Sequence, residues 1–227
     1  MTLEQLESLN AEQKARTVLV VQDPFTSYYD AQVVADFVRL VEKLGFQPVL
    51  LPFSPNGKAQ HIKGFLNRFA KTAKKTADFL NRMAKLGMPM VGVDPALVLC
   101  YRDEYKLALG EERGEFNVLL ANEWLASALE SQPVATVSGE SWYFFGHCTE
   151  VTALPGAPAQ MGRDICPFWA RNWKMSAWVA AAWQGLTDMK RKTIKIRSGS
   201  MSYPGIRLCS DCRVTAVWRP DIPAVAR

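Results

Sequence analysis

The sequence predicts an α/β fold, with a layered, largely parallel sheet and helical crossovers, followed by a poorly ordered, basic, tryptophan-rich tail. Short apolar runs alternate with segments whose apolar residues recur at helical spacing, and turn residues separate them. The character of the chain then changes, since residues 1–160 hold 15 Lys+Arg and 18 Asp+Glu, whereas residues 161–227 hold 12 Lys+Arg and 4 Asp. No glutamate follows Glu150, and five of the seven tryptophans lie in the tail. This break indicates that the tail was not shaped to fold with the rest.

Each expected strand is a short apolar run that closes at a proline, a glycine or a polar turn. The expected strands are Thr17–Val21, 48–51, 90–93 and 142–145. The expected helices cover 33–44, 62–86, 96–109 and 116–129, and Gly45 and Gly87 are placed to end the first two. In the long helix, Ile62, Phe65 and Leu66 are expected to face the core together with Phe69, Ala73, Leu80, Met83 and Leu86.

The chain divides into an N-terminal lead-in over 1–16, an α/β domain over 17–160 and the anomalous tail over 161–227. No apolar run reaches membrane-spanning length, and the start lacks a basic-then-apolar signal pattern. Five cysteines in a chain without such a signal favour reduced thiols and a cytoplasmic location. No glycine-rich phosphate loop follows the first strand, so a nucleotide site of the usual kind is not expected.

Thiol and imidazole groups mark the candidate metal site. His147 and Cys148 directly follow the last expected strand, where an α/β sheet presents functional loops, and both are good ligands for iron or zinc. A buried thiol beside an exposed histidine is the plain alternative for this pair. Cys100 lies within a helical pattern and is expected in the core. Cys209 and Cys212 have the two-residue spacing of zinc and redox sites, which is a weak signal for a single pair.

Several segments carry a resemblance to a known family. They are residues 20–30, 93–96 with 102–105, and 146–148. Over residues 17–160 the chain resembles the C-terminal region of FAD-linked D-2-hydroxy-acid oxidoreductases, namely the D-lactate, glycolate and D-2-hydroxyglutarate dehydrogenases with an iron–sulfur module. That region is similar to the cysteine-rich Cys-Cys-Gly domain. The resemblance implies a parent enzyme with a 4Fe-4S cluster, whose partner is an FAD-containing dehydrogenase domain lying upstream.

The family places cysteines in two repeats, each with a strand-end cysteine, a Cys-Cys-Gly motif and a last cysteine. In the first repeat Asp23 and Pro24 occupy the place of the first cysteine, and residues 54–57 stand where Cys-Cys-Gly would be. Ala96 or Leu97 stands at the cysteine that follows Asp-Pro, and Cys100 falls about one helical turn late. The first repeat is therefore expected to be structural. In the second repeat His147-Cys148 matches the opening ligand, but Cys-Cys-Gly does not follow.

A change of reading frame explains the missing motif. Residues 179–189 require codons that, read out of phase, can encode Cys-Cys-Gly-Met-Ala-Gly-Thr-Tyr-Gly-His, as the resemblance implies. We therefore expect the frame to change near residues 160–161, and Cys166, Cys209 and Cys212 to be products of the wrong frame. Trp169, Trp173, Trp178 and Trp183 recur at four- or five-residue spacing and could form only a loose helix.

A fragment of an FAD-linked oxidoreductase is the favoured hypothesis. An iron–sulfur cluster needs about four ligands, whereas this chain supplies Cys148, assisted at most by His147, so the fragment itself is expected to be inactive. Whether the chain is an enzyme is left open, because its parent would be one. A zinc module using His147, Cys148, Cys209 and Cys212 is the first alternative. A single-strand nucleic-acid-binding protein using residues 189–197 and the tail tryptophans is the second, and it is not favoured.

Overall fold

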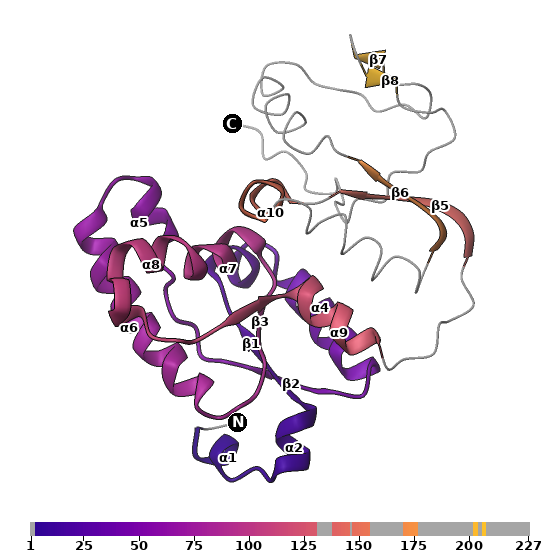
Figure 1. Ribbon diagram of the computed structural model, residues 1–227. Coiled ribbons are helices and arrows are strands. Elements are labelled where there is room, and N and C mark those ends of the chain that lie inside the picture. Colours follow the sequence, from indigo (N-terminus) through magenta and orange to yellow (C-terminus); the bar gives the residue numbers. More distant parts are fainter. Residues whose placement is uncertain are drawn as a thin grey trace, which may run out of the picture. The chain divides into compact units, whose positions relative to one another are not determined.

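The structure is a computed structural model that describes residues 3–130, 138–145, 147–154, 170–176, 202–203 and 206–207 (Figure 1). It divides into two compact units, unit 1 over 1–132 and unit 2 over 133–227. Each is described by itself. The expected boundary at residues 160–161 stays a prediction, and so does the poor order of the tail, most of which lies outside the described residues.

Unit 1 is built on a four-stranded parallel sheet with the order β2-β1-β3-β4. The strands are β1 (Thr17–Val21), β2 (Gln47–Leu50), β3 (Met90–Gly92) and β4 (Val118–Leu120). All five residues of β1 are buried, as expected of a central strand covered on both faces. The register pairs Leu19 of β1 with Val49 of β2 and with Met90 of β3. The predicted α/β fold with a parallel sheet is therefore confirmed.

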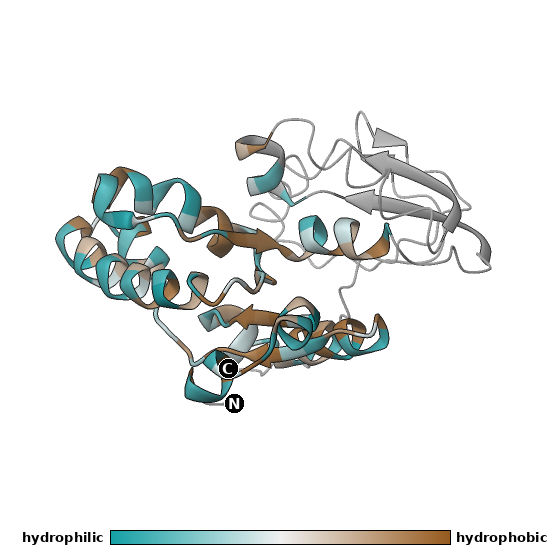
Figure 2. Cartoon of the chain, turned by 60° about the horizontal axis from the view of Figure 1, so that its bottom comes forward, coloured by the Kyte–Doolittle hydropathy of each residue, from teal (hydrophilic) through white to brown (hydrophobic). Residues whose placement is uncertain are grey.

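Helices connect these strands and cover the sheet on both faces (Figure 1). They are α1 (Leu3–Glu7), α2 (Ala11–Arg16), α3 (Pro24–Tyr28), α4 (Ala31–Lys43), α5 (Lys58–Ile62), α6 (Leu66–Ala84), α7 (Pro95–Arg102), α8 (Glu104–Leu109), the 3-10 helix η1 (Gly110–Arg113) and α9 (Ala121–Leu129). One layer contains α4 and α9, and the other contains α6, α7 and α8. Figure 2 shows hydrophobic strands between helices whose residues alternate between hydrophobic and hydrophilic, as amphipathic helices require.

Aromatic side chains fill the space between the sheet and each helical layer. Between α4 and α9, the Trp124 ring meets Phe37 edge-on at 5.9 Å and Phe46 at 5.3 Å between centroids. On the other face, the Tyr105 ring meets Tyr101 at 5.1 Å and packs against α6 as well. Each such edge-to-face pair contributes about 1 kcal/mol beyond its buried area.

The described residues of unit 2 form two short sheets and one short helix. Strand β5 (Ser138–Phe145) pairs in parallel with β6 (Ala170–Ser176), and α10 (Cys148–Ala153) lies between them in sequence. A short antiparallel pair, β7 (Ser202–Tyr203) and β8 (Ile206–Arg207), follows. The loose helix expected around Trp173 is wrong, because residues 170–176 form a strand. The cause lies in strand pairing with β5, which helical spacing of the tryptophans does not reveal.

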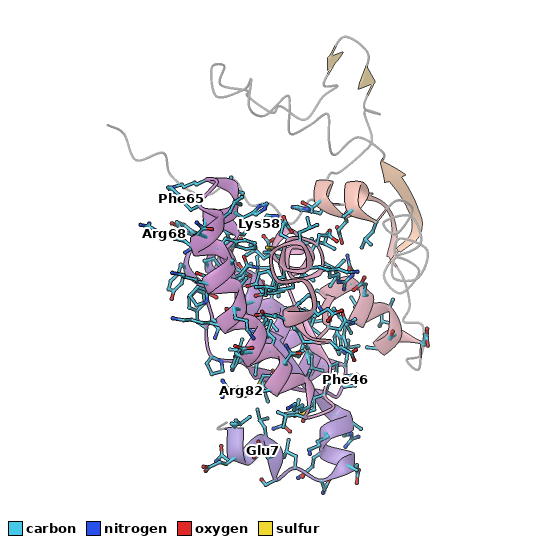
Figure 3. All side chains as sticks on the ribbon, turned by 60° about the vertical axis from the view of Figure 1, so that its left-hand side comes forward. Glu7, Phe46, Lys58, Phe65, Arg68 and Arg82 are labelled. Atoms are coloured by element: carbon cyan, nitrogen blue, oxygen red, sulfur yellow. The ribbon has the colours of Figure 1, made fainter. Side chains whose placement is uncertain are left out.

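Two of the predicted helices are each interrupted by a turn, and near the first interruption three side chains that were expected to be buried are exposed. The expected helix over 62–86 instead contains the last residue of α5 and all of α6, which are separated at Gly64, whose φ of 76° an ordinary helix does not tolerate. Ile62, Phe65 and Leu66 were expected inside but are 71%, 51% and 58% exposed. Figure 3 shows Phe65 and Arg68 at the outer margin of unit 1, with the guanidinium 5.6 Å from the ring centroid. The helix over 96–109 is likewise interrupted at Asp103, between α7 and α8.

The predicted helix over 116–129 is wrong in its first half. Val118–Leu120 forms β4, the fourth strand of the parallel sheet, and only Ala121–Leu129 is helical. The run from Val118 to Leu125 is too short for periodicity to separate a buried strand from a helix. The strand expected at 142–145 does exist within β5, but it belongs to the separate sheet of unit 2.

Candidate functional site

The carboxyl edge of the first sheet is where α/β proteins of this topology bind ligands, at the point where neighbouring connections diverge. In unit 1 that point lies between β1 and β3, and the chain leaves both strands through an Asp-Pro pair that begins a helix. Asp23 is buried and accepts hydrogen bonds from the backbone N–H groups of Phe25 and Thr26, both at 2.8 Å. Asp94 accepts one from Leu97 N at 3.0 Å. Both carboxylates are therefore helix N-caps.

Asn56 connects the loop after β2 to the helices after β3. Its side-chain amide donates to the carbonyl oxygen of Leu97 at 3.1 Å, and its Oδ1 accepts from Lys58 N at 2.9 Å. The Tyr105 hydroxyl donates to the Asn56 carbonyl oxygen at 2.7 Å. At the next residue, Gly57 has a φ of 82°, so the turn needs glycine. These bonds tie together segments 41 and 49 residues apart in the chain.

Beside Asn56 lie a thiol and an ion pair. Cys100 is fully buried, and burial raises the pKa of its thiol to about 12, with the Glu104 carboxylate acting in the same direction. Lys58 forms a salt bridge with Glu104, and each side chain is only 18% exposed. The predicted core location of Cys100 is confirmed. Because the thiol is held in its protonated form, it is a poor metal ligand or nucleophile as it stands.

The structure thus brings together two of the three places at which the resemblance puts cysteines in the first repeat. Asn56 lies against Leu97 and Cys100, and the Asp23 carboxylate is near enough to Tyr101 for its charge to act on that phenol. One sulfur is present, and the oxygen and nitrogen groups are engaged as caps and cross-links. Across the residues the structure describes, no three His, Cys, Asp or Glu side chains gather closely enough to hold a metal ion. This arrangement stabilises the fold and does not fit an iron–sulfur cluster.

His147, at which the resemblance places the start of the second repeat, caps α10. His147 N donates to Glu150 Oε2 at 2.9 Å, and Thr149 N donates to His147 Nδ1 at 3.2 Å, which is a capping box. With Nδ1 accepting, the ring proton of a neutral imidazole lies on Nε2, so metal binding would require this arrangement to change. Cys148 is the first residue of α10, and its side chain lies outside the described part of the structure. Cys166, Cys209 and Cys212 lie outside it too, so the predicted ligands stay predictions.

A separate hollow of about 360 Å³ lies at the opposite edge of the sheet, where α2 leads into β1. Its lining includes Glu7 and Arg82, which Figure 3 shows at the same end of unit 1, together with Leu3, Lys14, Lys85 and Leu86. No buried polar group points to a ligand here, and Arg82 and Lys85 at the end of α6 suit the negative end of the helix dipole.

Sequence reasoning found the Asp-Pro pairs but missed the role of Asn56 and a group of exposed aromatic side chains near α3. The Ser-Pro-Asn-Gly sequence signals only a turn, and hydrogen bonds over 40 residues leave no local signal. Within the described residues, every helix is too short or too polar to cross a lipid bilayer.

The chain is similar in sequence to part of several larger proteins that share one name. It is 95% identical over 171 residues to D-2-hydroxyglutarate dehydrogenase of Escherichia coli, a match that covers 75% of this chain and 17% of that protein. The chain resembles a fragment of a larger oxidoreductase. Proteins of the same name match it at 73% identity in Pantoea ananatis (75% of the chain) and 58% in Haemophilus influenzae (70%), covering 17% and 16% of those relatives. The chain therefore spans about a sixth of their length. No family model and no solved structure matches it.

Proposed function

We propose that this chain is part of the iron–sulfur electron-transfer domain of an FAD-linked dehydrogenase that oxidises a D-2-hydroxy acid. The observation that carries the proposal is the 95% identity over 171 residues to a protein named D-2-hydroxyglutarate dehydrogenase. That name favours D-2-hydroxyglutarate as the parent's substrate. Flavin would be bound by the remainder of the parent, which would pass electrons to the cluster.

The chain as written does not hold a native cluster under this proposal. A 4Fe-4S cluster takes about four ligands, mostly thiolates. In the first repeat those places are taken by Asp23, Asn56 and neighbouring groups that already bond within the fold. In the second repeat the candidates are Cys148 and His147, and the latter caps α10. The fragment would therefore have lost the parent's electron-transfer function.

The extent of the match agrees with a change of reading frame. The E. coli relative matches 75% of the chain at 95% identity, although a true homologue this close would be expected to match throughout. The unmatched remainder is comparable in size to residues 161–227, which differ in charge, glutamate content and tryptophan density. We propose that the frame changes near residues 160–161 and that the following codons conceal the Cys-Cys-Gly motif.

The nucleotide sequence of the gene, from well upstream of codon 1 to beyond codon 227, tests this directly. The expected result is Cys-Cys-Gly in the shifted frame after codon 179 and flavoprotein coding sequence upstream. A shifted frame without cysteines, or unrelated sequence upstream, would refute the proposal.

Cluster reconstitution is the matching biochemical test. The chain as written and a version with the frame restored are incubated anaerobically with iron and sulfide, and bound iron is measured. About four iron atoms per chain are expected for the restored version and fewer than one for the chain as written. The restored version with Cys148→Ser is the control for ligation and should lose the cluster. One tightly bound zinc in the chain as written would favour the zinc module instead. Salt-sensitive binding of single-stranded nucleic acid that disappears without residues 161–227 would favour the third hypothesis.

A further inference from the structure

Four aromatic side chains form an exposed cluster at the carboxyl edge of unit 1, which we call the aromatic patch. They are Phe25 (51% exposed), Tyr28 (69%), Tyr29 (83%) and Phe53 (37%). The Tyr28 and Phe53 rings meet edge-on at 5.4 Å, and the Phe25 and Tyr29 rings lie 6.3 Å apart. Phe25, Tyr28 and Tyr29 are three and four residues apart, which places them on one side of α3 and its end. Three of the four aromatic side chains therefore come from α3 and its end, and the fourth contacts one of them.

Partly buried hydrogen bonds hold the backbone that carries the patch. Asp23 fixes the start of α3, as described above, and its other oxygen accepts from the Thr26 hydroxyl. Gln22 donates through Nε2 to the Leu51 carbonyl oxygen at 2.7 Å and accepts from the Ser27 hydroxyl at 3.3 Å. Gln22 thereby links α3 to the segment that carries Phe53. A preorganised surface loses little conformational entropy when it binds a partner.

The size of the patch suits the centre of an interface between domains. At about 200 Å² for each aromatic side chain, the exposed fractions leave roughly 500 Å² of aromatic surface open. Patches of this size on soluble proteins commonly mark interaction sites, and interfaces between domains of one chain bury about 600–1,500 Å². Tyrosine is enriched at such sites because its ring packs while its hydroxyl tolerates water. The patch would form the core of that interface, and polar residues around it would form the rim.

We propose that the aromatic patch docks against the flavin-containing remainder of the parent dehydrogenase. This inference rests on the proposed function. The chain covers 17% of the E. coli relative, so 83% of that protein lies outside the matched segment and can supply a surface for the patch. The patch also lies at the edge of the sheet where Asp23 and Asn56 mark the places of the first repeat's cysteines. Docking there would place the interface at the carboxyl edge of the sheet, where the loops that follow the strands lie.

Photo-crosslinking in the intact E. coli relative tests this. p-Benzoylphenylalanine is introduced at the position aligned with Tyr29 and, in a matched control, at the position aligned with Leu107, which is 87% exposed and outside the patch. Flavin content and dehydrogenase activity confirm that each variant is folded. The Tyr29 position is expected to crosslink to residues outside the segment matched by this chain, and the Leu107 position is not.

The outcomes separate the docking inference from the proposed function. Crosslinks from the Tyr29 position that stay within the matched segment, join two copies of the protein or fail to form would overturn the docking inference. The proposed function would stand in each case if the relative contains flavin and oxidises D-2-hydroxyglutarate. As a second measurement on this chain, sedimentation is compared before and after Tyr28→Ser with Tyr29→Ser. A dimer of the unaltered chain that becomes a monomer in the variant would assign the patch to a second copy and refute the inference.

Discussion

Replacing Asn56 by alanine should destabilise unit 1 substantially, because this side chain cross-links two connections of the sheet. The Asn56→Ala change removes its hydrogen bonds to Leu97 O and from Lys58 N, at 3.1 and 2.9 Å. Each bond contributes about 1 kcal/mol, and a buried partner left without a bond costs about 1–3 kcal/mol. Asn56 is 1% exposed, so water cannot fully replace the amide. The expected loss is about 2–4 kcal/mol in the free energy of unfolding of unit 1.

Hydrogen exchange followed by mass spectrometry measures this loss, because peptides from Thr17–Val21 report on unit 1 alone. The matched control is Asn67→Ala, which removes the same amide from an exposed position within α6. Alanine favours helix, so the control should change stability by less than about 0.7 kcal/mol. If the backbone amides of Thr17–Val21 were equally protected from hydrogen exchange in Asn56→Ala and in Asn67→Ala, the cross-linking role assigned to Asn56 would be wrong.

Three further predictions concern a turn, a carboxylate and a thiol. Gly57→Ala should lower the free energy of unfolding by at least about 1 kcal/mol more than Gly64→Ala, as measured by thermal unfolding. Both glycines have positive φ, but a Cβ at Gly57 would lie 2.9 Å from a phenylalanine ring carbon, whereas Gly64 faces open space. Equal losses for the two variants would contradict this. Burial opposes ionisation of Glu123, but hydrogen bonds from Arg102 and a backbone N–H outweigh it and lower the pKa of the carboxyl. The ionised carboxylate therefore stabilises the fold above the ordinary carboxyl pKa, and this stabilisation is lost as pH falls through the lowered pKa of Glu123. Glu123→Gln should flatten that part of the profile of stability against pH. An unchanged profile would refute the stabilising role of the Glu123 carboxylate. Cys100, whose pKa burial raises to about 12, should resist iodoacetamide at pH 8 in the folded chain and react after unfolding, as peptide mapping would show; labelling in the native chain would contradict its burial.

Three of the four strands of the central sheet were predictable, because each contains a short apolar run that a proline, a glycine or a polar turn closes. Thr17–Val21 is buried at every position, so a run of β-branched residues followed by Asp-Pro identifies it without ambiguity. Val118–Leu120 is also apolar, but only Val118 is β-branched, and the run continues directly into α9. Nothing local marks the change from strand to helix there, and only pairing with Met90–Gly92 makes it a strand.

The core was less predictable where glycine interrupts a helix. Ile62 and Leu66 share the spacing of the buried face of α6, but Gly64 turns the chain before that helix begins. Ile62, which precedes the turn, therefore faces away from the core, and Leu66 is exposed at the first residue of α6. A glycine within a periodic apolar pattern can be tolerated or can end a helix, and the sequence does not distinguish these outcomes.

The candidate site was predictable in its positions and not in its bonding. The Asp-Pro pairs and His147 were identified from sequence, and all three prove to be helix caps. The cross-links made by Asn56 depend on segments that come together only in the folded chain. The same holds for the aromatic patch, since α3 is a short helix whose outward face has no distinguishing period.

The order in which unit 1 is completed along the chain has a consequence for the cell. Its last strand ends at Leu120 and its last covering helix at Leu129. If the gene changes frame near codons 160–161, as proposed, the ribosome has already made the entire sheet and both helical layers of unit 1. Proteases of the cell would then meet unit 1 with its sheet and helical layers complete. We expect a lesion of this kind to abolish the enzyme while leaving a persistent remnant of it.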